Sequence, residues 1–266
     1  MAGDAQGCPV CRGTGYAIEQ RDGIEVAVLC GCRRGAATGA TLAAARVPVR
    51  YEHCTIAGFE VWSRDPGSRN LQARAQRRTR EFVDCYPDVD KGLLFMGSVG
   101  TGKTHLAVAA LRELARTKGA RGLYVNALDL VQELQMAFDG GGASREDVLR
   151  PVTDTELLVL DELGAGRLTE WVRDLLYYVI NARYMSRRVT VFTTNFLDAP
   201  QPPRGDEKAG LGAGGSETGK GERWQETLAD RISERLRSRL YEMAAVVELR
   251  GEDYRARHAG RPGGRR

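Results

Sequence analysis

Short apolar runs alternate with amphipathic stretches through most of the chain, from about Val47 to Arg255. Four of these runs are short and rich in apolar or β-branched residues, as buried parallel strands are. They are Gly92 to Met96, Gly122 to Asn126, Leu157 to Leu160 and Val189 to Thr194. The alternation of such runs with helix-like segments predicts an α/β fold, in which helices flank a parallel sheet.

The segments between and after these strands have the residue spacing of helices. They are Thr104 to Arg116, Ala127 to Phe138, Glu170 to Ser186 and Trp224 to Met243, and a strand-like run, Ala245 to Leu249, follows the last of them. Residues 199–223 are rich in Pro, Gly and charge, so we expect a flexible surface loop there. We predict an N-terminal module over residues 1–45 and a core over residues 46–266, with a basic tail over 256–266.

Composition sets broad limits on the kind of protein. A hydrophobic content of 42% in 266 residues suits a globular protein and argues against disorder throughout. There is no apolar run of membrane-spanning length and no hydrophobic stretch of the secretory type at the N-terminus, so we expect a soluble cytoplasmic protein with no membrane contact. The net charge of +4 permits an anionic partner. Six arginines between Arg64 and Arg80 leave a solvated surface and a nucleic-acid contact both open.

Residues 97–104 form a glycine-rich phosphate-binding motif. They read Gly97-Ser98-Val99-Gly100-Thr101-Gly102-Lys103-Thr104, between a predicted strand and a predicted helix. In this pattern the glycines let backbone N–H groups surround phosphates, and the helix N-terminus adds a favourable dipole. We expect Lys103 to contact the β- and γ-phosphates of ATP and the Thr104 hydroxyl to bind Mg²⁺. A plain glycine-rich turn is the alternative, but the position between strand and helix is the one that phosphate binding requires.

Two acidic residues and one amide follow later predicted strands. Asp161 and Glu162 end an apolar run. We expect Asp161 to hold Mg²⁺ and Glu162 to polarise the water that attacks the γ-phosphate, although acids at this point also cap helices. Asn195 follows the strand that ends at Thr194, where a polar side chain would reach the γ-phosphate; a turn residue is its alternative.

With these elements in this order, the sequence resembles the AAA+ ATPases, and within them the DnaC/DnaI/IstB-like group of helicase loaders and transposition helpers. The resemblance covers residues from about Val47 to Arg255. Beyond the motifs above, it is carried by Val47-Pro48-Val49-Arg50-Tyr51, His105-Leu106-Ala107, Leu163-Gly164, Asn181-Ala182-Arg183-Tyr184, Thr193-Thr194-Asn195, Arg235-Leu236-Arg237-Ser238-Arg239-Leu240 and Gly251-Glu252-Asp253-Tyr254-Arg255.

The resemblance implies roles for residues that no local pattern explains. ATP is expected to lie between subunits, so that a neighbour's Arg239 acts as an arginine finger, with Arg235 one helical turn earlier on the same face. An exposed basic helix face is the alternative. Asn195 corresponds to sensor 1 and Arg255 to sensor 2, and His105 joins the nucleotide-binding residues. A large C-terminal lid is expected to be absent, as in helicase loaders.

Four cysteines cluster near the N-terminus as Cys8-x-x-Cys11 and Cys30-x-Cys32, with 18 residues between the pairs. Two such pairs are typical of a tetrahedral Zn²⁺ site, although one spacer residue in the second pair is less common. Disulfides are the main alternative and do not suit a cytoplasmic protein. Cys54 and Cys85 are expected to be small buried side chains. DnaI-like loaders carry an N-terminal zinc module, so the resemblance implies an adaptor that docks on the replicative helicase.

Together these observations predict a helicase loader-like DNA replication ATPase that needs ATP, Mg²⁺ and Zn²⁺. We expect it to form homo-oligomers in the ATP state and to act with a replicative helicase on DNA, most simply single-stranded DNA. One alternative is an IstB-like transposition helper whose partner is a transposase. Two others are an adaptor that binds nucleotide without hydrolysing it, and a zinc- and DNA-binding module.

Overall fold

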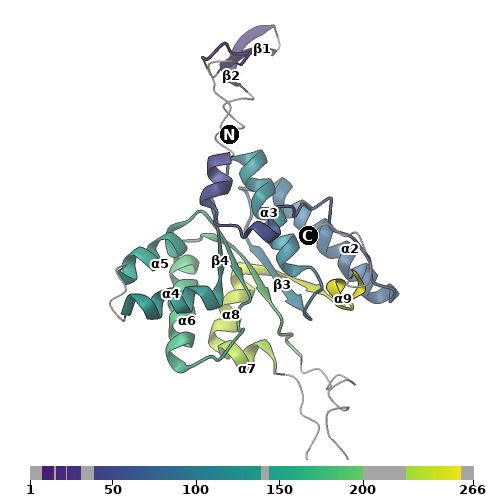
Figure 1. The fold of residues 1–266 in the computed structure, drawn as a ribbon, viewed down its shortest axis with the longest axis vertical. Helices are drawn as coiled ribbons and strands as arrows, with labels where there is room; N and C mark the ends of the chain where they lie inside the picture. Colours follow the sequence, from purple (N-terminus) through teal and green to yellow (C-terminus); the bar gives the residue numbers. More distant parts are fainter. Residues whose placement is uncertain are drawn as a thin grey trace, which may run out of the picture.

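A parallel β-sheet forms the centre of the protein, as a computed structural model describes it for residues 8–14, 16–21, 23–30, 39–138, 144–199 and 226–258. The sheet has five strands in the order β4-β5-β6-β3-β7, and each adjacent pair is parallel (Figure 1). Their bounds are β3 Gly92–Gly97, β4 Gly122–Asn126, β5 Leu157–Asp161, β6 Val189–Thr194 and β7 Ala244–Leu249. The predicted α/β class and the predicted strands are therefore confirmed.

Helices cover both faces of this sheet (Figure 1). They are α2 Pro66–Cys85, α3 Lys103–Lys118, α4 Ala127–Phe138, α5 Arg145–Asp154, α6 Glu170–Met185, α7 Leu228–Ile232, α8 Glu234–Met243 and α9 Tyr254–His258, with a short 3-10 helix, η2, at Val49–Tyr51. Alternate strand residues point to opposite faces. Phe95 packs with α2 and α3, whereas its neighbours Leu94 and Met96 pack with α4 to α8. None of the helices in the described segments is long and apolar enough to cross a membrane.

The last predicted helix, Trp224 to Met243, is wrong in its extent and continuity. Within the described residues, α7 ends at Ile232 and α8 begins at Glu234. Ser233 between them has a positive φ of 82° and an extended ψ, which no helix accommodates. Residues 200–225 lie outside the described part, and they include nearly all of the predicted loop at 199–223. The tail residues beyond 258 lie outside it as well.

Helices α2 and α5 were not predicted, although both have N-terminal signals in the sequence. The carboxylate of Asp65 accepts from the Ser68 N–H at 2.7 Å and caps α2, whose first residue is Pro66. Ser144 and Asp147 form a reciprocal capping box at the start of α5. Helix α2 lacked a clear apolar stripe because Gln72 and Thr79 occupy two of its buried positions.

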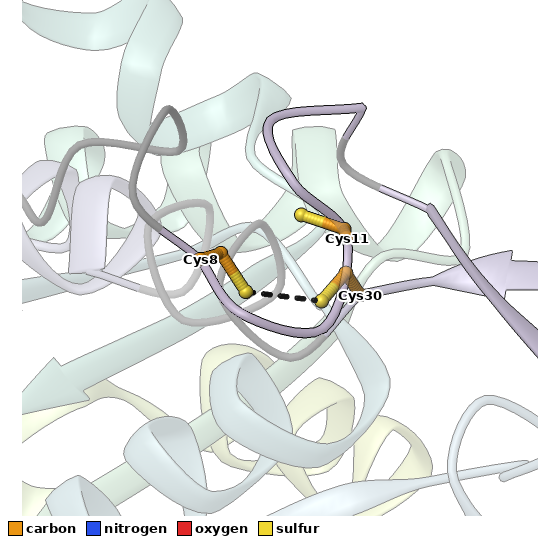
Figure 2. A group of neighbouring side chains, drawn as sticks. All are labelled: Cys8, Cys11 and Cys30. Atoms are coloured by element: carbon orange, nitrogen blue, oxygen red, sulfur yellow. Dashed lines mark hydrogen bonds between the residues drawn. The ribbon is translucent and has the colours of Figure 1, made fainter.

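An antiparallel hairpin near the N-terminus, β1 Tyr16–Arg21 and β2 Ile24–Leu29, was also missed. Asp-Gly at 22–23 is a common signal for a two-residue hairpin turn. The hairpin returns the chain so that Cys30 meets Cys8 and Cys11 (Figure 2). Cys32, the fourth predicted zinc ligand, lies outside the described residues.

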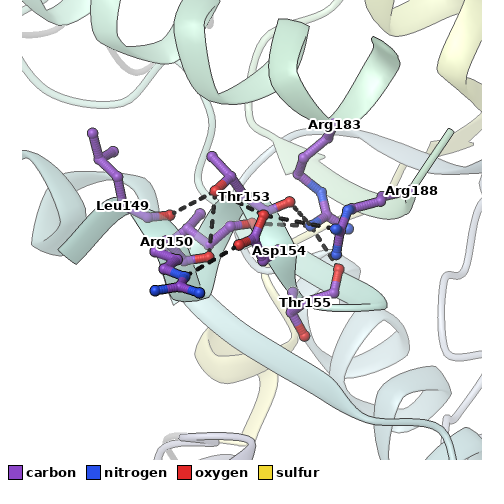
Figure 3. Close-up of polar contacts among 8 residues, drawn as sticks. Leu149, Arg150, Thr153, Asp154, Thr155, Arg183 and Arg188 are labelled. Carbon is purple, nitrogen blue, oxygen red and sulfur yellow. Dashed lines mark hydrogen bonds and ion pairs between the residues drawn. The ribbon is translucent and has the colours of Figure 1, made fainter. Parts of the chain in front are cut away.

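A buried arginine joins two segments where β5 and β6 begin (Figure 3). Arg183 on α6 is 1% exposed, and its guanidinium donates to the carbonyls of Val152 and Thr155 at 2.9 Å and of Val189 at 2.7 Å. Its Nε also donates to the Thr190 hydroxyl at 2.8 Å. Burial lowers the pKa of Arg183 to about 9, which leaves the group charged at neutral pH. The side chain therefore satisfies carbonyls that the end of α5 and the start of β6 leave unpaired.

Candidate nucleotide-binding site

The carboxyl ends of three adjacent strands, β5, β6 and β3, bring polar residues to one edge of the sheet. β3 leads into the glycine-rich loop, β5 ends at Asp161, and β6 ends at Thr194. In open parallel sheets, ligands bind at this edge. A cavity of about 440 Å³ lies there, which is within the usual range for small-molecule sites.

The glycine-rich loop surrounds the amino group of Lys103. Lys103 Nζ donates to the carbonyls of Gly97 at 2.9 Å and Ser98 at 2.7 Å, and Thr101 Oγ1 donates to the Ser98 carbonyl at 2.8 Å. Burial lowers the pKa of Lys103 to about 8. The loop also contacts the C-terminal segment, since the Tyr254 N–H donates to the Gly100 carbonyl at 3.1 Å. The lysine is thus already held at the N-terminus of α3, where phosphate is favoured.

Two glycines of the loop have no room for a side chain. Gly100 and Gly102 have positive φ angles of 75° and 95°. A Cβ at Gly102 would lie 2.5 Å from a ring carbon of Phe59, and one at Gly100 would lie 2.2 Å from Cγ of Asp253. Both positions therefore require glycine for conformational and for steric reasons.

Gly102→Ala is expected to weaken ATP binding by about tenfold or more, since a left-handed alanine costs about 1–2 kcal/mol and the clash with Phe59 shifts the loop. The matched control is Gly119→Ala at the end of α3. Gly119 has a similar φ of 67° but nothing within 4 Å of an added Cβ. Titration with a fluorescent ATP analogue checks this, and equal losses in both variants would contradict the steric argument.

Asp161 is buried and accepts three side-chain hydrogen bonds. Oδ1 accepts from Thr104 Oγ1 at 3.0 Å and from Thr193 Oγ1 at 2.5 Å, and Oδ2 accepts from the Tyr124 hydroxyl at 2.7 Å. Burial raises the pKa of Asp161, and the three hydroxyl groups oppose that rise. Burial and the nearby Asp161 raise the pKa of Tyr124, so its hydroxyl stays a donor.

The Thr104–Asp161 pair fits a magnesium site. Adjacent ligands of octahedral Mg²⁺ lie about 3.0 Å apart, given bond lengths of about 2.1 Å. The 3.0 Å between Thr104 Oγ1 and Asp161 Oδ1 matches that separation. A hydroxyl and a carboxylate are also the oxygen ligands that this ion prefers.

Glu162 is held in a fixed position beside Asp161. Its backbone is left-handed, with a φ of 59°, and its N–H donates to Thr193 Oγ1 at 2.9 Å. Its carboxylate accepts from Asn126 Nδ2 at 3.2 Å, and the Asn126 amide is itself oriented by the Leu128 N–H at 2.9 Å. A non-glycine residue in this conformation costs about 1–3 kcal/mol, a strain typical of functional sites.

The structure brings most of the predicted site residues to this one cavity. The predicted residues that line it are Val99, Gly100, Gly102, Lys103, Thr104, His105, Glu162, Asn195 and Arg255. The hydrogen bonds given above connect a second set of predicted residues to this lining, namely Gly97, Ser98, Thr101 and Asp161. Sequence reasoning gave no role to the residues that position the acids, namely Tyr124, Asn126 and Thr193. It also gave none to the wall formed by Tyr51, Phe59, Trp62 and Tyr254, although Thr193, Tyr51 and Tyr254 were among the residues that carry the resemblance.

Comparison with known proteins agrees with this geometry. The family model described as IstB-like ATP binding protein matches residues 52–199, which include the glycine-rich loop, both acids and Asn195. This chain belongs to that IstB-like family. The crystal structure of the DnaC helicase loader is 31% identical, with a TM-score of 0.59, and the match covers 76% of this chain and all of that chain.

Two curated relatives of this IstB-like chain are replicative helicase loaders by name. DnaC of Escherichia coli K12 is 29% identical over 124 residues, or 47% of this chain and 50% of that protein. DnaI of Bacillus subtilis 168 is 33% identical over 178 residues, or 66% of this chain and 51% of that protein. The match thus spans about half the length of these curated relatives.

Arg239 does not reach the cavity in this IstB-like chain. It lies on α8, where Tyr184, Arg235, Ser238, Arg239 and Glu242 line a separate surface hollow. Its guanidinium lies over the Tyr177 ring at 5.0 Å and the Tyr184 ring at 5.1 Å, and Nη1 donates to Asn181 Oδ1. One copy of the chain therefore does not bring Arg239 to its own phosphate-binding loop.

Proposed function

We propose that this protein is a helicase loader-like AAA+ ATPase, which binds Mg·ATP, hydrolyses it and acts on a replicative helicase on DNA. The convergence of Lys103, the Thr104–Asp161 pair and Glu162 at one cavity carries the ATPase part. The relatives that are named helicase loaders support the partner. We assign the ATPase to a core over residues 46–266 and the adaptor to residues 1–45.

Each residue of the cavity has a distinct task in this chemistry. Lys103 and the backbone N–H groups of the loop hold the β- and γ-phosphates. Thr104 and Asp161 hold Mg²⁺, which supplies positive charge to the phosphate oxygens when bound. Glu162 accepts the proton of the attacking water, and Asn195 orients that water or the γ-phosphate. Arg255 lines the cavity from the C-terminal segment and contributes a further cation.

We assign Arg239 to the ATP site of a neighbouring copy. Two other arginines on these helices already have acidic partners: Arg231 on α7 pairs with Glu226 at 3.0 Å, and Arg237 on α8 pairs with Asp198 at 2.7 Å. Across the described segments, no ion pair involves Arg235 or Arg239. Stacking on neutral tyrosine rings leaves the charge of Arg239 available to an external anion.

Arg239→Ala is expected to lower kcat for ATP hydrolysis by about 10² while ATP binding stays close to that of the wild type. The matched control is Arg237→Ala, because Arg237 lies two residues earlier on α8 and is already paired with Asp198. A mixture of Arg239→Ala with Lys103→Ala subunits should regain activity, because the second subunit supplies an intact Arg239 to the first. Activity equal to the sum of the two separate variants would contradict an active site shared between subunits.

The N-terminal cysteines are assigned to Zn²⁺. One ligand atom from each of Cys8, Cys11 and Cys30 lies within 4.8 Å of the others. The Sγ atoms of Cys8 and Cys30 are 3.7 Å apart (Figure 2), close to the spacing of about 3.8 Å between thiolates around tetrahedral Zn²⁺ and far beyond a disulfide bond of about 2.0 Å. Cys32 is proposed as the fourth ligand. A metal site stabilises a segment too short to form its own apolar core.

A basic face of α2 supports contact with DNA. The arginines at and before this helix, Arg64, Arg69, Arg74, Arg77, Arg78 and Arg80, are all exposed. Among the ion pairs of the described segments, one involves these arginines, and it joins Arg78 to Glu81. Several exposed cations on one helix without acidic partners attract a phosphate backbone.

The partner is tested by copurification from the native cell in the presence of ATP. Glu162→Gln is used as bait because a slowed hydrolytic step holds the ATP-bound state, and Lys103→Ala is the control that should not reach that state. Enrichment of the replicative helicase by the first bait over the second supports the loader. Recovery of a transposase instead indicates the IstB-like transposition helper, and recovery of DNA alone, without dependence on ATP, indicates the DNA-binding module.

A further inference from the structure

Three side chains with metal-binding chemistry meet at one wall of the nucleotide cavity, and none of them has been assigned a metal above. His53 and Cys54 lie between η2 and α2, and His105 lies in the first turn of α3. One ligand atom from each lies within 4.8 Å of the other two. All three residues also line the cavity that holds Lys103 and Glu162. Residues 51 positions apart in sequence thus converge on one point.

The ring of His105 is oriented as a metal ligand would be. His105 Nε2 lies 2.9 Å from the Thr55 carbonyl oxygen, so Nε2 carries the proton and donates it there. In that tautomer Nδ1 has the lone pair. Metal-binding histidines commonly have the second ring nitrogen fixed by a backbone carbonyl in this way. Phe59 contacts the same ring edge-to-face, with centroids 5.7 Å apart, and further restricts it.

The other two side chains supply complementary positions. The ring of His53 is exposed and lies edge-to-face to that of His105, with centroids 6.3 Å apart. Cys54 is 1% exposed, and so its sulfur faces the two histidine rings from the side of the protein interior. One thiolate and two imidazoles form a ligand set that suits Zn²⁺. Three protein ligands leave a fourth position open to water or to a bound molecule.

We propose that His53, Cys54 and His105 form a second transition-metal site of the Zn²⁺ class, separate from the magnesium pair and from the N-terminal cysteines. On binding, the sulfur–metal bond forms as the Cys54 thiol proton leaves to solvent, and both imidazoles bind as neutral ligands. The metal ties residues 53–55 to the first turn of α3. Because Thr104 directly precedes His105, occupancy of this site fixes one wall of the nucleotide cavity.

The site is tested with Co²⁺ added to the metal-free full-length chain, because tetrahedral Co²⁺ gives visible d–d bands and a thiolate charge-transfer band. The wild type is compared with His53→Asn, which changes an exposed ligand, and with Cys54→Ser. Cys85→Ser is the matched control, since Cys85 is exposed, contrary to the prediction that it is buried, and belongs to neither group of metal-binding side chains. Circular dichroism checks that each variant is folded.

We expect the wild type and Cys85→Ser to bind one more equivalent of Co²⁺ per chain than His53→Asn and Cys54→Ser bind. The charge-transfer band should fall by the contribution of one thiolate in both ligand variants. Equal stoichiometry and equal spectra in the wild type and folded His53→Asn would overturn the proposal. Because Cys8, Cys11 and Cys30 remain intact in all variants, the N-terminal cluster contributes equally to each titration.

Discussion

Glu162→Gln is expected to slow ATP hydrolysis by about 10²- to 10⁴-fold, the usual contribution of a general base. Glutamine keeps the shape of the side chain and can still contact Asn126, but it has no carboxylate to accept the proton of water. ATP affinity should stay within about twofold, because the phosphate-binding loop and the Thr104–Asp161 pair are unchanged. Phosphate release under saturating Mg·ATP gives kcat, and equilibrium titration gives the affinity.

The control for this variant is Glu60→Gln. Glu60 lines the same cavity but makes no contact with Asp161 or Thr104 among the hydrogen bonds of the described residues. Its hydrolysis rate should match that of the wild type. If the wild type hydrolyses ATP and Glu162→Gln does so at the same rate, Glu162 is not the base. If the wild type itself does not hydrolyse ATP, the non-hydrolysing adaptor becomes the better account.

Arg183→Met is expected to lower the free energy of unfolding by about 3–5 kcal/mol, because it leaves three buried carbonyls without a donor and each unsatisfied group costs about 1–3 kcal/mol. Methionine fills much of the space but donates no hydrogen bond. The carbonyls of Val152, Thr155 and Val189 would remain buried without their partner. Urea unfolding followed by circular dichroism measures the loss.

The matched control is Arg188→Met, three residues after α6 ends. Its side chain is 33% exposed, and Nη2 lies 3.7 Å from Asp154 Oδ1, a weak pair at the surface (Figure 3). Such pairs contribute about 0–1 kcal/mol. Similar losses in both variants would show that burial of the Arg183 guanidinium is not what stabilises this region.

The sequence predicts the sheet and the phosphate-binding loop well because each depends on local patterns. Apolar runs mark strands of a sheet covered on both faces, and the glycine-rich motif needs one short segment between a strand and a helix. The acids were also found locally, as polar residues that end an apolar run. All of these signals lie within a few residues of the group that they identify.

The residues that position the acids depend on strand register, which no local pattern provides. In the pairing of β4 with β5, Asn126 lies opposite Asp161, and so its amide is beside Glu162. Thr193 reaches Asp161 from β6. Asn126 ends a predicted strand and Asn195 directly follows one, so the same reasoning applied to β4 would have found Asn126. The role that we propose for Arg239 requires a second subunit, so the structure of one chain does not provide it.

The most direct test of the central claim is equilibrium binding of a fluorescent ATP analogue, with Mg²⁺ present and absent, to the wild type, Lys103→Ala and Lys118→Ala. Lys118 is the control, because it lies at the far end of α3 and donates to the Asp84 carbonyl. We expect Lys103→Ala to bind about 10- to 100-fold more weakly, the effect of one lost charged hydrogen bond, and Lys118→Ala to bind like the wild type. A wild-type affinity in Lys103→Ala would contradict the assignment of this cavity to the phosphates of ATP.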